Sequence, residues 1–223
     1  MKTAIVTGTT LGVGRKTVTE LSNMGYKVIA TSRDPERIKD LESENVYVEK
    51  LDTTNFNEIK ALYEKYKDIT LDVLVNNAAG AVDATNLVNE DPNNFTKSYM
   101  LNVSGPMYLT KLFTNNLAKS ENSTVIFISS FAGKYLYTGQ SNYTNSKSAV
   151  SNLADLFRLE YAPLNIKVTE ICPATINTRE DQRRDIAMTS EDIVSAIIWV
   201  CGMPKHCNIN FIEMAPTLSR KYL

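Results

Sequence analysis

Short apolar runs rich in β-branched residues alternate along this chain with longer segments in which apolar residues recur every three or four positions. Runs of the first kind predict buried strands, and segments of the second kind predict amphipathic helices. The predicted strands are Ala4–Thr7, Lys27–Ser32, Val46–Leu51, Leu71–Val75, Thr124–Ser129, Lys167–Ile171 and Asn208–Ile212. The predicted helices are Val13–Met24, Pro35–Glu44, Asn55–Tyr66, Asn93–Ala118, Tyr143–Tyr161 and Ser190–Cys201. This alternation predicts one α/β domain over residues 1–223, a doubly wound parallel sheet with helices on both faces.

Composition changes this picture only by excluding other classes of protein. The 223 residues are 43% hydrophobic and 22% charged, and a net charge of −1 provides no basic surface for nucleic acid or an anionic membrane. No run approaches the ~20 apolar residues that span a bilayer, and the chain begins without the apolar core of a signal peptide. Three cysteines without a CxxC pair, together with a single histidine, argue against a metal site or a disulfide framework. We therefore expect a cytoplasmic protein that binds no metal, nucleic acid or membrane.

Three glycines, Gly8, Gly12 and Gly14, follow the first predicted strand, and a helical pattern comes directly after them. Glycine lets the backbone turn sharply and approach a diphosphate, and the following helix offers free N–H groups and the positive end of its dipole. A phosphate-binding P-loop would need Lys where Arg15 stands, and the GxGxxG motif would need Gly where Thr17 stands. The order of strand, glycine turn and helix predicts a nucleotide site, with a simple turn as the alternative.

The glycine spacing and five later motifs resemble the short-chain dehydrogenase/reductase family. The matching segments follow the family's order along almost the whole chain: Thr7–Gly14, Asp72–Gly80, Asn102–Pro106, Ile128–Ser130, Tyr143–Lys147 and Pro173–Thr178. The resemblance implies a Rossmann-type fold and an oxidoreductase that transfers a hydride between a nicotinamide cofactor and a small carbonyl or alcohol substrate. It implies cofactor contacts at Gly8, Thr10, Leu11, Gly12, Gly14, Asn77, Ala78, Ile176 and Thr178. Asn77 resembles the asparagine that steadies the central strands, while Ala79 and Ala174 stand where the family usually has glycine.

The end of the second predicted strand indicates which nicotinamide cofactor binds. Ser32 stands where relatives that prefer NAD carry an acidic residue, which would repel a 2′-phosphate. Arg33 follows with a guanidinium suited to phosphate, although a solvated surface charge is the alternative. Asp34 precedes Pro35, a pattern typical of a helix N-cap rather than of a ribose ligand. We therefore expect NADP rather than NAD. Asp52 resembles the family residue that contacts adenine, and a turn or helix cap is an equal alternative.

Tyr143 and Lys147 are four residues apart at the start of a helical pattern, which places them on one face of the helix. A phenol has a pKa near ~10, and a close ammonium together with an oxidised nicotinamide would bring that pKa to about 7. Such a tyrosine can take a proton from an alcohol or give one to a carbonyl. Tyr63 and Lys67 have the same spacing, but their segment is rich in Glu and Lys and follows no hydroxyl at a strand end.

Two further polar residues belong to the expected catalytic set. Ser130 follows an apolar strand and resembles the family serine that hydrogen-bonds the substrate oxygen, with Ser129 as the neighbouring alternative. Asn102 is a poor helix former within a long helical pattern, and from the pattern alone it is a surface or kink residue. By resemblance, it completes a set with Ser130, Tyr143 and Lys147 and binds a water that connects Lys147 to solvent. The resemblance also assigns Lys147 to the ribose hydroxyls of the cofactor.

Few residues separate Thr178 from the helix predicted to begin at Ser190, which indicates a lightly covered substrate site. Three arginines in this segment either attract an anionic substrate or form a solvated, charged lid: Arg179, Arg183 and Arg184.

The remaining expectations concern substrate class and assembly. The tail segment Asn208–Pro216 resembles that of reductases and dehydrogenases that act on small hydroxy acids or similar alcohols. In the family, helices corresponding to Asn93–Ala118 and Tyr143–Tyr161 pair between subunits, which implies a homodimer or homotetramer. A second hypothesis is a non-catalytic NADP-binding redox sensor of the same fold, although every position of the catalytic set is filled. Epimerase or dehydratase chemistry on nucleotide sugars is weaker, because those relatives carry a large additional C-terminal region.

Overall fold

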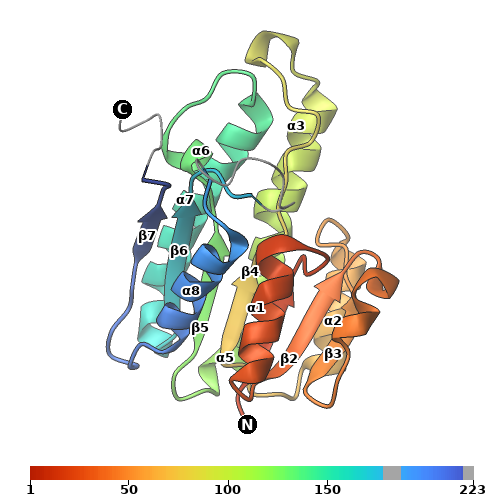
Figure 1. Cartoon of the computed structure of the whole chain (residues 1–223), viewed down its shortest axis with the longest axis vertical. Helices are drawn as coiled ribbons and strands as arrows, with labels where there is room; N and C mark the ends of the chain where they lie inside the picture. The colour runs from red at the N-terminus through yellow and green to blue at the C-terminus, as the bar shows by residue number, and fades with distance from the viewer. Residues whose placement is uncertain (178–186, 218–223) are drawn as a thin grey trace.

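The computed structural model describes residues 1–177 and 187–217, and a sheet of seven parallel strands lies at its centre (Figure 1). The strands are β1 (Thr3–Thr7), β2 (Lys27–Ser32), β3 (Val46–Lys50), β4 (Val73–Asn76), β5 (Thr124–Ile128), β6 (Lys167–Pro173) and β7 (Phe211–Met214). Their order in the sheet is β3-β2-β1-β4-β5-β6-β7. The order reverses between β1 and β4, which is where ligands bind in sheets of this kind. The predicted doubly wound parallel sheet is confirmed.

Helices cover both faces of the sheet, with α1 and α8 on the viewer's side in Figure 1. One face packs against α1 (Gly12–Asn23), α8 (Ser190–Cys201) and the 3₁₀ helix η1 (Pro35–Leu41). The other face packs against α2 (Phe56–Tyr66), α4 (Gly105–Leu112), α5 (Thr114–Ala118) and α7 (Ser141–Tyr161). The other helical segments are α3 (Pro92–Tyr99), α6 (Phe131–Lys134), the 3₁₀ helices η2 (Leu87–Asn89) and η4 (Ala162–Leu164), and the π-helix η3 (Met100–Ser104).

Each face of the sheet has its own hydrophobic core, and the same strands contribute side chains to both cores. Successive side chains of a strand point to opposite faces, so Val6 joins the core under α1 and α8 while Ile5 joins the core under α2 and α7. Strand runs that are apolar throughout therefore become buried on both sides. Within the described residues, none of the helices combines the length and the apolar character needed to cross a membrane.

The helix predicted over Asn93–Ala118 is wrong as one continuous helix. It is divided into α3, η3, α4 and α5. Pro106 has no N–H to donate to the Asn102 carbonyl four residues earlier, and its ring would clash with that carbonyl. The regular α-helical hydrogen bonds therefore cannot continue past Pro106. The π-helical turn at Met100–Ser104 accommodates this interruption, and such turns are frequent at functional sites. A second break at Phe113 separates α4 from α5.

The end of the chain also differs from its prediction. The strand expected over Asn208–Ile212 is displaced to β7, because the Asn208 side chain occupies the edge of β6 where a backbone would pair. Its Oδ1 accepts from the Val168 N–H at 2.7 Å, and its Nδ2 donates to the Val168 carbonyl at 3.1 Å. The helix predicted over Pro35–Glu44 is the shorter 3₁₀ helix η1. Helix α6 was not predicted, since four residues are too few to show a helical period.

Candidate active site

A cavity of about 630 Å³ opens at the carboxyl ends of the strands and extends from the glycine turn to the first turn of α7. Twelve residues predicted from the sequence line it: Gly8, Thr10, Leu11, Gly12, Ser32, Arg33, Asn77, Ala78, Ser130, Tyr143, Lys147 and Ile176. Gly14, Asp52 and Asn102 lie outside this lining, and Thr178 and the three arginines that follow it lie outside the described residues. The structure therefore brings most of the predicted residues together in one cavity.

The glycine turn forms one wall of the cavity. Gly8 has a φ of +69°, and a Cβ there would lie 2.8 Å from the Ala78 Cα, so both the conformation and the space require glycine. Helix α1 begins at Gly12, and its N-cap residue Leu11 makes no side-chain cap. The N–H groups of the first turn are therefore available to an anionic ligand, as a diphosphate site requires.

Gly14 and Asn77 contact the backbone of the glycine turn and so support its shape. Asn77 Nδ2 donates to the carbonyls of Thr7 and Gly8 at 2.9 and 3.0 Å, and the N–H groups of Asn77 and Ala78 both donate to Thr7 Oγ1 at 3.0 Å. These bonds join the end of β1 to the end of β4, as expected of a residue that steadies the central strands. Gly14 lies against the same carbonyl and amide, so its lack of a side chain is a packing requirement.

Replacing Gly14 with alanine is expected to destabilise the fold. The new Cβ would lie 2.4 Å from the Gly8 carbonyl oxygen and 2.5 Å from Asn77 Nδ2, neither of which is a flexible side-chain end. Overpacking of this kind costs about 1–3 kcal/mol of the free energy of unfolding, measurable by urea denaturation. Gly202→Ala is the matched control, because its nearest contact is an ordinary 3.4 Å. Equal stability of the two variants would contradict the packing argument.

Two arginines lie in the cavity lining where β2 leads into η1. Arg33 and Arg37 both line it, and within the described part of the chain neither forms an ion pair. Ser32 is buried, and its hydroxyl donates to the Asp34 carbonyl at 2.9 Å and accepts from the Asp34 N–H at 3.1 Å. Asp34 occupies the N-cap position of η1 without a side-chain cap bond. Sequence reasoning missed Arg37, although its position four residues after Arg33 at the start of a helical segment was a usable signal.

Asp52 forms a local turn. Its Oδ1 accepts from the Thr54 N–H at 2.9 Å and from Thr54 Oγ1 at 2.8 Å, and its own N–H donates to the Glu58 carboxylate at 2.8 Å. The neighbouring residues Leu51 and Thr53 line the cavity instead. The turn, one of the two alternatives left by the sequence, is present, while contact with adenine stays a prediction.

Tyr143, Lys147 and Ser130 meet at the other end of the cavity. Lys147 is almost completely buried, its Nζ donates to the Ile128 carbonyl at 2.8 Å, and it lies 5.8 Å from the centre of the Tyr143 ring. Ser130 follows β5, accepts from the Ala132 N–H at 3.1 Å as the N-cap of α6, and lies close enough to the Tyr143 phenol to lower its pKa. Ser129 is buried and its hydroxyl is directed to the Lys147 carbonyl. This geometry favours Ser130 over Ser129 as the serine beside the tyrosine.

Burial dominates the electrostatics of this group. It raises the pKa of Tyr143, and the hydrogen bond from Ser130 only partly offsets that effect. Burial also lowers the pKa of Lys147 to about 8, against the opposing influence of Cys172 and Glu170. The protein groups alone therefore do not bring the phenol pKa down, contrary to the part of the expectation that relied on Lys147. A desolvated phenol is the weaker acid, so its ionised form needs a further positive charge close by.

The buried Lys147 predicts a specific dependence of stability on pH. The unfolded chain holds this proton up to about its ordinary pKa of 10.5, whereas the folded chain releases it at about 8. Unfolding therefore takes up a proton in this interval, and the free energy of unfolding rises with pH there. Relative to Lys147→Met, wild type should gain up to about 3 kcal/mol between about pH 7 and pH 10.5, measured by urea denaturation. A difference that stays constant with pH would contradict the burial argument.

The Asn102 side chain hydrogen-bonds to Gly80 after β4, to Ser98 in α3 and to Ser146 in α7. It is buried within η3, and its Nδ2 donates to the Gly80 carbonyl at 2.9 Å, to Ser98 Oγ at 3.2 Å and to Ser146 Oγ at 2.9 Å. Its Oδ1 accepts from the Gly80 N–H at 3.0 Å. A surface position is therefore excluded, and the kink is present. The water link from Asn102 to Lys147 stays a prediction.

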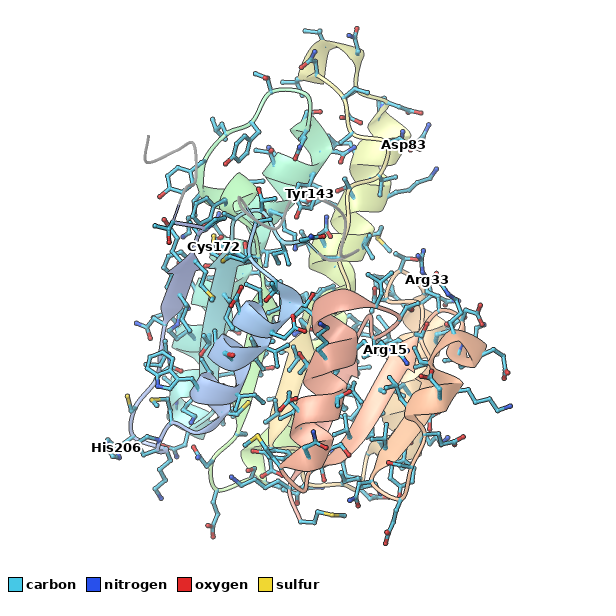
Figure 2. All side chains as sticks on the ribbon, viewed as in Figure 1. Arg15, Arg33, Asp83, Tyr143, Cys172 and His206 are labelled. Carbon is cyan, nitrogen blue, oxygen red and sulfur yellow. The ribbon has the colours of Figure 1, made fainter. Side chains whose placement is uncertain are left out.

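Other chemistry-bearing residues lie away from this cavity. His206 is exposed at the end of the molecule opposite Tyr143 and Arg33 (Figure 2). Among residues 1–177 and 187–217, no three or more His, Cys, Asp or Glu side chains gather in a way that could hold a metal ion. Cys172 is a buried residue of β6 that influences the pKa of Lys147, and burial raises its own pKa to about 12.

A nucleotide-sized cavity at the reversal of a doubly wound sheet, with a glycine turn at one end and a tyrosine–lysine pair at the other, defines a dinucleotide-dependent oxidoreductase site. Residues 2–188 match the protein family described as short chain dehydrogenase. The chain therefore belongs to the short-chain dehydrogenase family.

Particular members of that family resemble the chain along nearly its whole length. It is 28% identical to the NADP-dependent 3-hydroxy acid dehydrogenase of Escherichia coli (strain K12), over 95% of this chain and 94% of that protein. The protein of the same description from Salmonella typhi is 31% identical, with the same coverage. Among solved structures, the closed form of serine dehydrogenase complexed with NADP⁺ superposes with a TM-score of 0.88 at 28% identity, over 96% of this chain and 94% of that one.

Proposed function

We propose that this chain is an NADP-dependent oxidoreductase that transfers a hydride between nicotinamide and a small alcohol or carbonyl substrate. The observation that carries the proposal is that one cavity is lined both by Arg33 and Arg37 and by Tyr143 and the buried Lys147. NADP has a matching shape, with a 2′-phosphate far from its reactive ring. Relatives that match nearly the whole chain are described as NADP-dependent.

The residues present fit the parts of NADP in order along the cavity. The glycine turn and the first turn of α1 provide backbone N–H groups for the diphosphate. Arg33 and Arg37 provide guanidinium groups for the 2′-phosphate. Lys147 would hold the ribose of the nicotinamide half, and Asn77, Ala78 and Ile176, which also line the cavity, would contact that half.

When bound, the reduced cofactor supplies the hydride. Tyr143 donates a proton to the substrate oxygen as the carbonyl becomes an alcohol, and in the reverse direction it accepts that proton. Ser130 would hold the same oxygen, since its hydroxyl lies close enough to the phenol to lower the pKa of Tyr143. Lys147 places a cation close to both groups in a buried setting, where charge interactions are stronger than in water.

We propose small 3-hydroxy acids and their keto counterparts as the substrate class. Two of the relatives are described as 3-hydroxy acid dehydrogenases, and a structural neighbour is described as serine dehydrogenase. Serine is itself a 3-hydroxy acid that carries an additional amino group. The proposal agrees with the hydroxy acid class that the tail Asn208–Pro216 indicates.

A substrate panel tests the proposal directly. NADP reduction is measured with serine, 3-hydroxybutyrate and 3-hydroxypropanoate, and simple alcohols and 2-hydroxy acids serve as comparison. We expect saturable reduction that is fastest with a 3-hydroxy acid. Tight NADPH binding without turnover of any alcohol or carbonyl would reject the enzyme and favour a non-catalytic NADP-binding regulator.

Assembly as a homodimer or homotetramer stays a prediction. Leu156 and Leu159 on α7 are 57% and 74% exposed, which is consistent with an apolar face available for contact between subunits.

A further inference from the structure

The first turn of α7 is held by a residue from a distant part of the chain. Glu90 lies between η2 and α3, and its carboxylate accepts hydrogen bonds from the Ser141 hydroxyl and from Asn142 Nδ2, the latter at 2.9 Å. The same carboxylate accepts from the Thr85 backbone N–H at 3.2 Å, and the nearby Asn142 backbone N–H also lowers its pKa. The Ser141 N–H in turn donates to the Thr85 carbonyl at 3.0 Å. The loop after β4 and the start of α7 are thus joined at several points.

The Thr85 carbonyl provides a backbone cap that α7 lacks in its own sequence, and Glu90 holds the side chains of the same turn. The N-cap residue Gln140 makes no side-chain cap, although the first N–H groups of a helix have no partner within it. A carboxylate at this end also interacts favourably with the helix dipole. Hydrogen bonds from Ser141 and Asn142 hold the pKa of Glu90 below its ordinary value, so the group is charged at neutral pH.

The capped turn is the one that carries the proposed proton donor. Tyr143 is the third residue of α7, so the direction of its phenol depends on how this turn is fixed. One turn further on, Asn102 and Ser98 bind Ser146 at 2.9 and 3.1 Å, which anchors α7 a second time to the segment that follows Glu90.

We propose that Glu90 is a positioning residue for Tyr143: the Glu90 carboxylate holds the first turn of α7 and fixes the direction from which the phenol enters the cavity. The inference rests on the proposed role of Tyr143. Glu90 itself lies outside the cavity lining, so its effect passes through the helix.

The first test is independent of activity. Hydrogen exchange at the backbone amides of residues 141–147 should be at least about five-fold faster in Glu90→Ala than in wild type, as expected when a contact that holds this turn is lost. Asp91→Ala is the matched control. It removes the adjacent carboxylate, which accepts from the Asn93 N–H at 2.8 Å and caps α3 instead of α7. Unchanged exchange over residues 141–147 in Glu90→Ala would overturn the proposal.

The second test asks whether Glu90 acts through Tyr143. Glu90→Ala should lower kcat about ten-fold and leave the Kd of NADPH within about two-fold, because a misplaced catalytic group costs rate rather than cofactor affinity. In a Tyr143→Phe background, the same substitution should change kcat less than about two-fold. Equal losses in the two backgrounds would overturn the proposal. Wild-type turnover by Tyr143→Phe alone would instead reject the proposed function, and the exchange result would still decide whether Glu90 holds the first turn of α7.

Discussion

Tyr143→Phe should lower kcat for reduction of the best carbonyl substrate by about 10²–10⁴-fold while the Kd of NADPH changes little. The substitution removes one hydroxyl and keeps the ring, so the cavity retains its shape. The lost group is the only one in our mechanism that carries a proton to the substrate oxygen. Steady-state rates of NADPH oxidation give kcat, and fluorescence titration of NADPH gives the Kd.

Tyr63→Phe is the matched control for this prediction. Tyr63 stands four residues before Lys67, as Tyr143 stands before Lys147, but it belongs to α2 and packs its ring against Phe113 at 5.4 Å. The kcat of Tyr63→Phe should remain within about two-fold of wild type. Full activity of Tyr143→Phe, or an equal loss in both variants, would show that Tyr143 is not the acid–base group.

Replacing Arg33 and Arg37 together with alanine should raise KM for NADPH by about 10²-fold or more and leave KM for NADH nearly unchanged. NADPH differs from NADH only in its 2′-phosphate, and a hydrogen bond to a charged group contributes about 1.5–3 kcal/mol. Two such contacts therefore account for at least two orders of magnitude. Initial rates with each cofactor, at one fixed concentration of carbonyl substrate, measure both constants.

Lys39→Ala controls for the loss of positive charge in the same helical segment. Lys39 also lies in η1, but it pairs with Glu36 at 3.5 Å and does not line the cavity. KM for NADPH should change by less than about two-fold in this variant. A parallel rise of KM for NADPH and NADH in the double arginine variant would mean that the arginines stabilise the site as a whole, and the assignment of the 2′-phosphate would be wrong.

The fold was predictable because its signals are local and repeated. Strands buried on both faces are apolar throughout, as in Val125–Ile128, and amphipathic helices separate them, so a parallel sheet was the economical arrangement. The division of the Asn93–Ala118 segment was harder to predict. Pro106 is visible in the sequence, but the surrounding polar contacts that stabilise a π-helical turn at Asn102 come from Gly80 and Ser146, which are distant along the chain.

The candidate site was predictable where a motif has fixed spacing and fixed context. Tyr143 was separable from Tyr63 because only Tyr143 follows a strand that ends in serine, and the structure places Ser130 beside it. The direction of the Tyr143 pKa was not predictable, since it depends on how deeply the phenol is buried, and sequence spacing does not measure burial. Glu90 had no signal either, because its partners Ser141 and Asn142 lie more than 50 residues away and meet it only through folding.

Transfer of a labelled hydride tests the central claim most directly. The alcohol that reduces NADP fastest in the panel is prepared with deuterium on its carbinol carbon and incubated with the enzyme and NADP. We predict that mass spectrometry of the resulting NADPH shows the deuterium at C4 of the nicotinamide ring. NADPH without the label, or no NADPH from any alcohol tested, would contradict hydride transfer at this site.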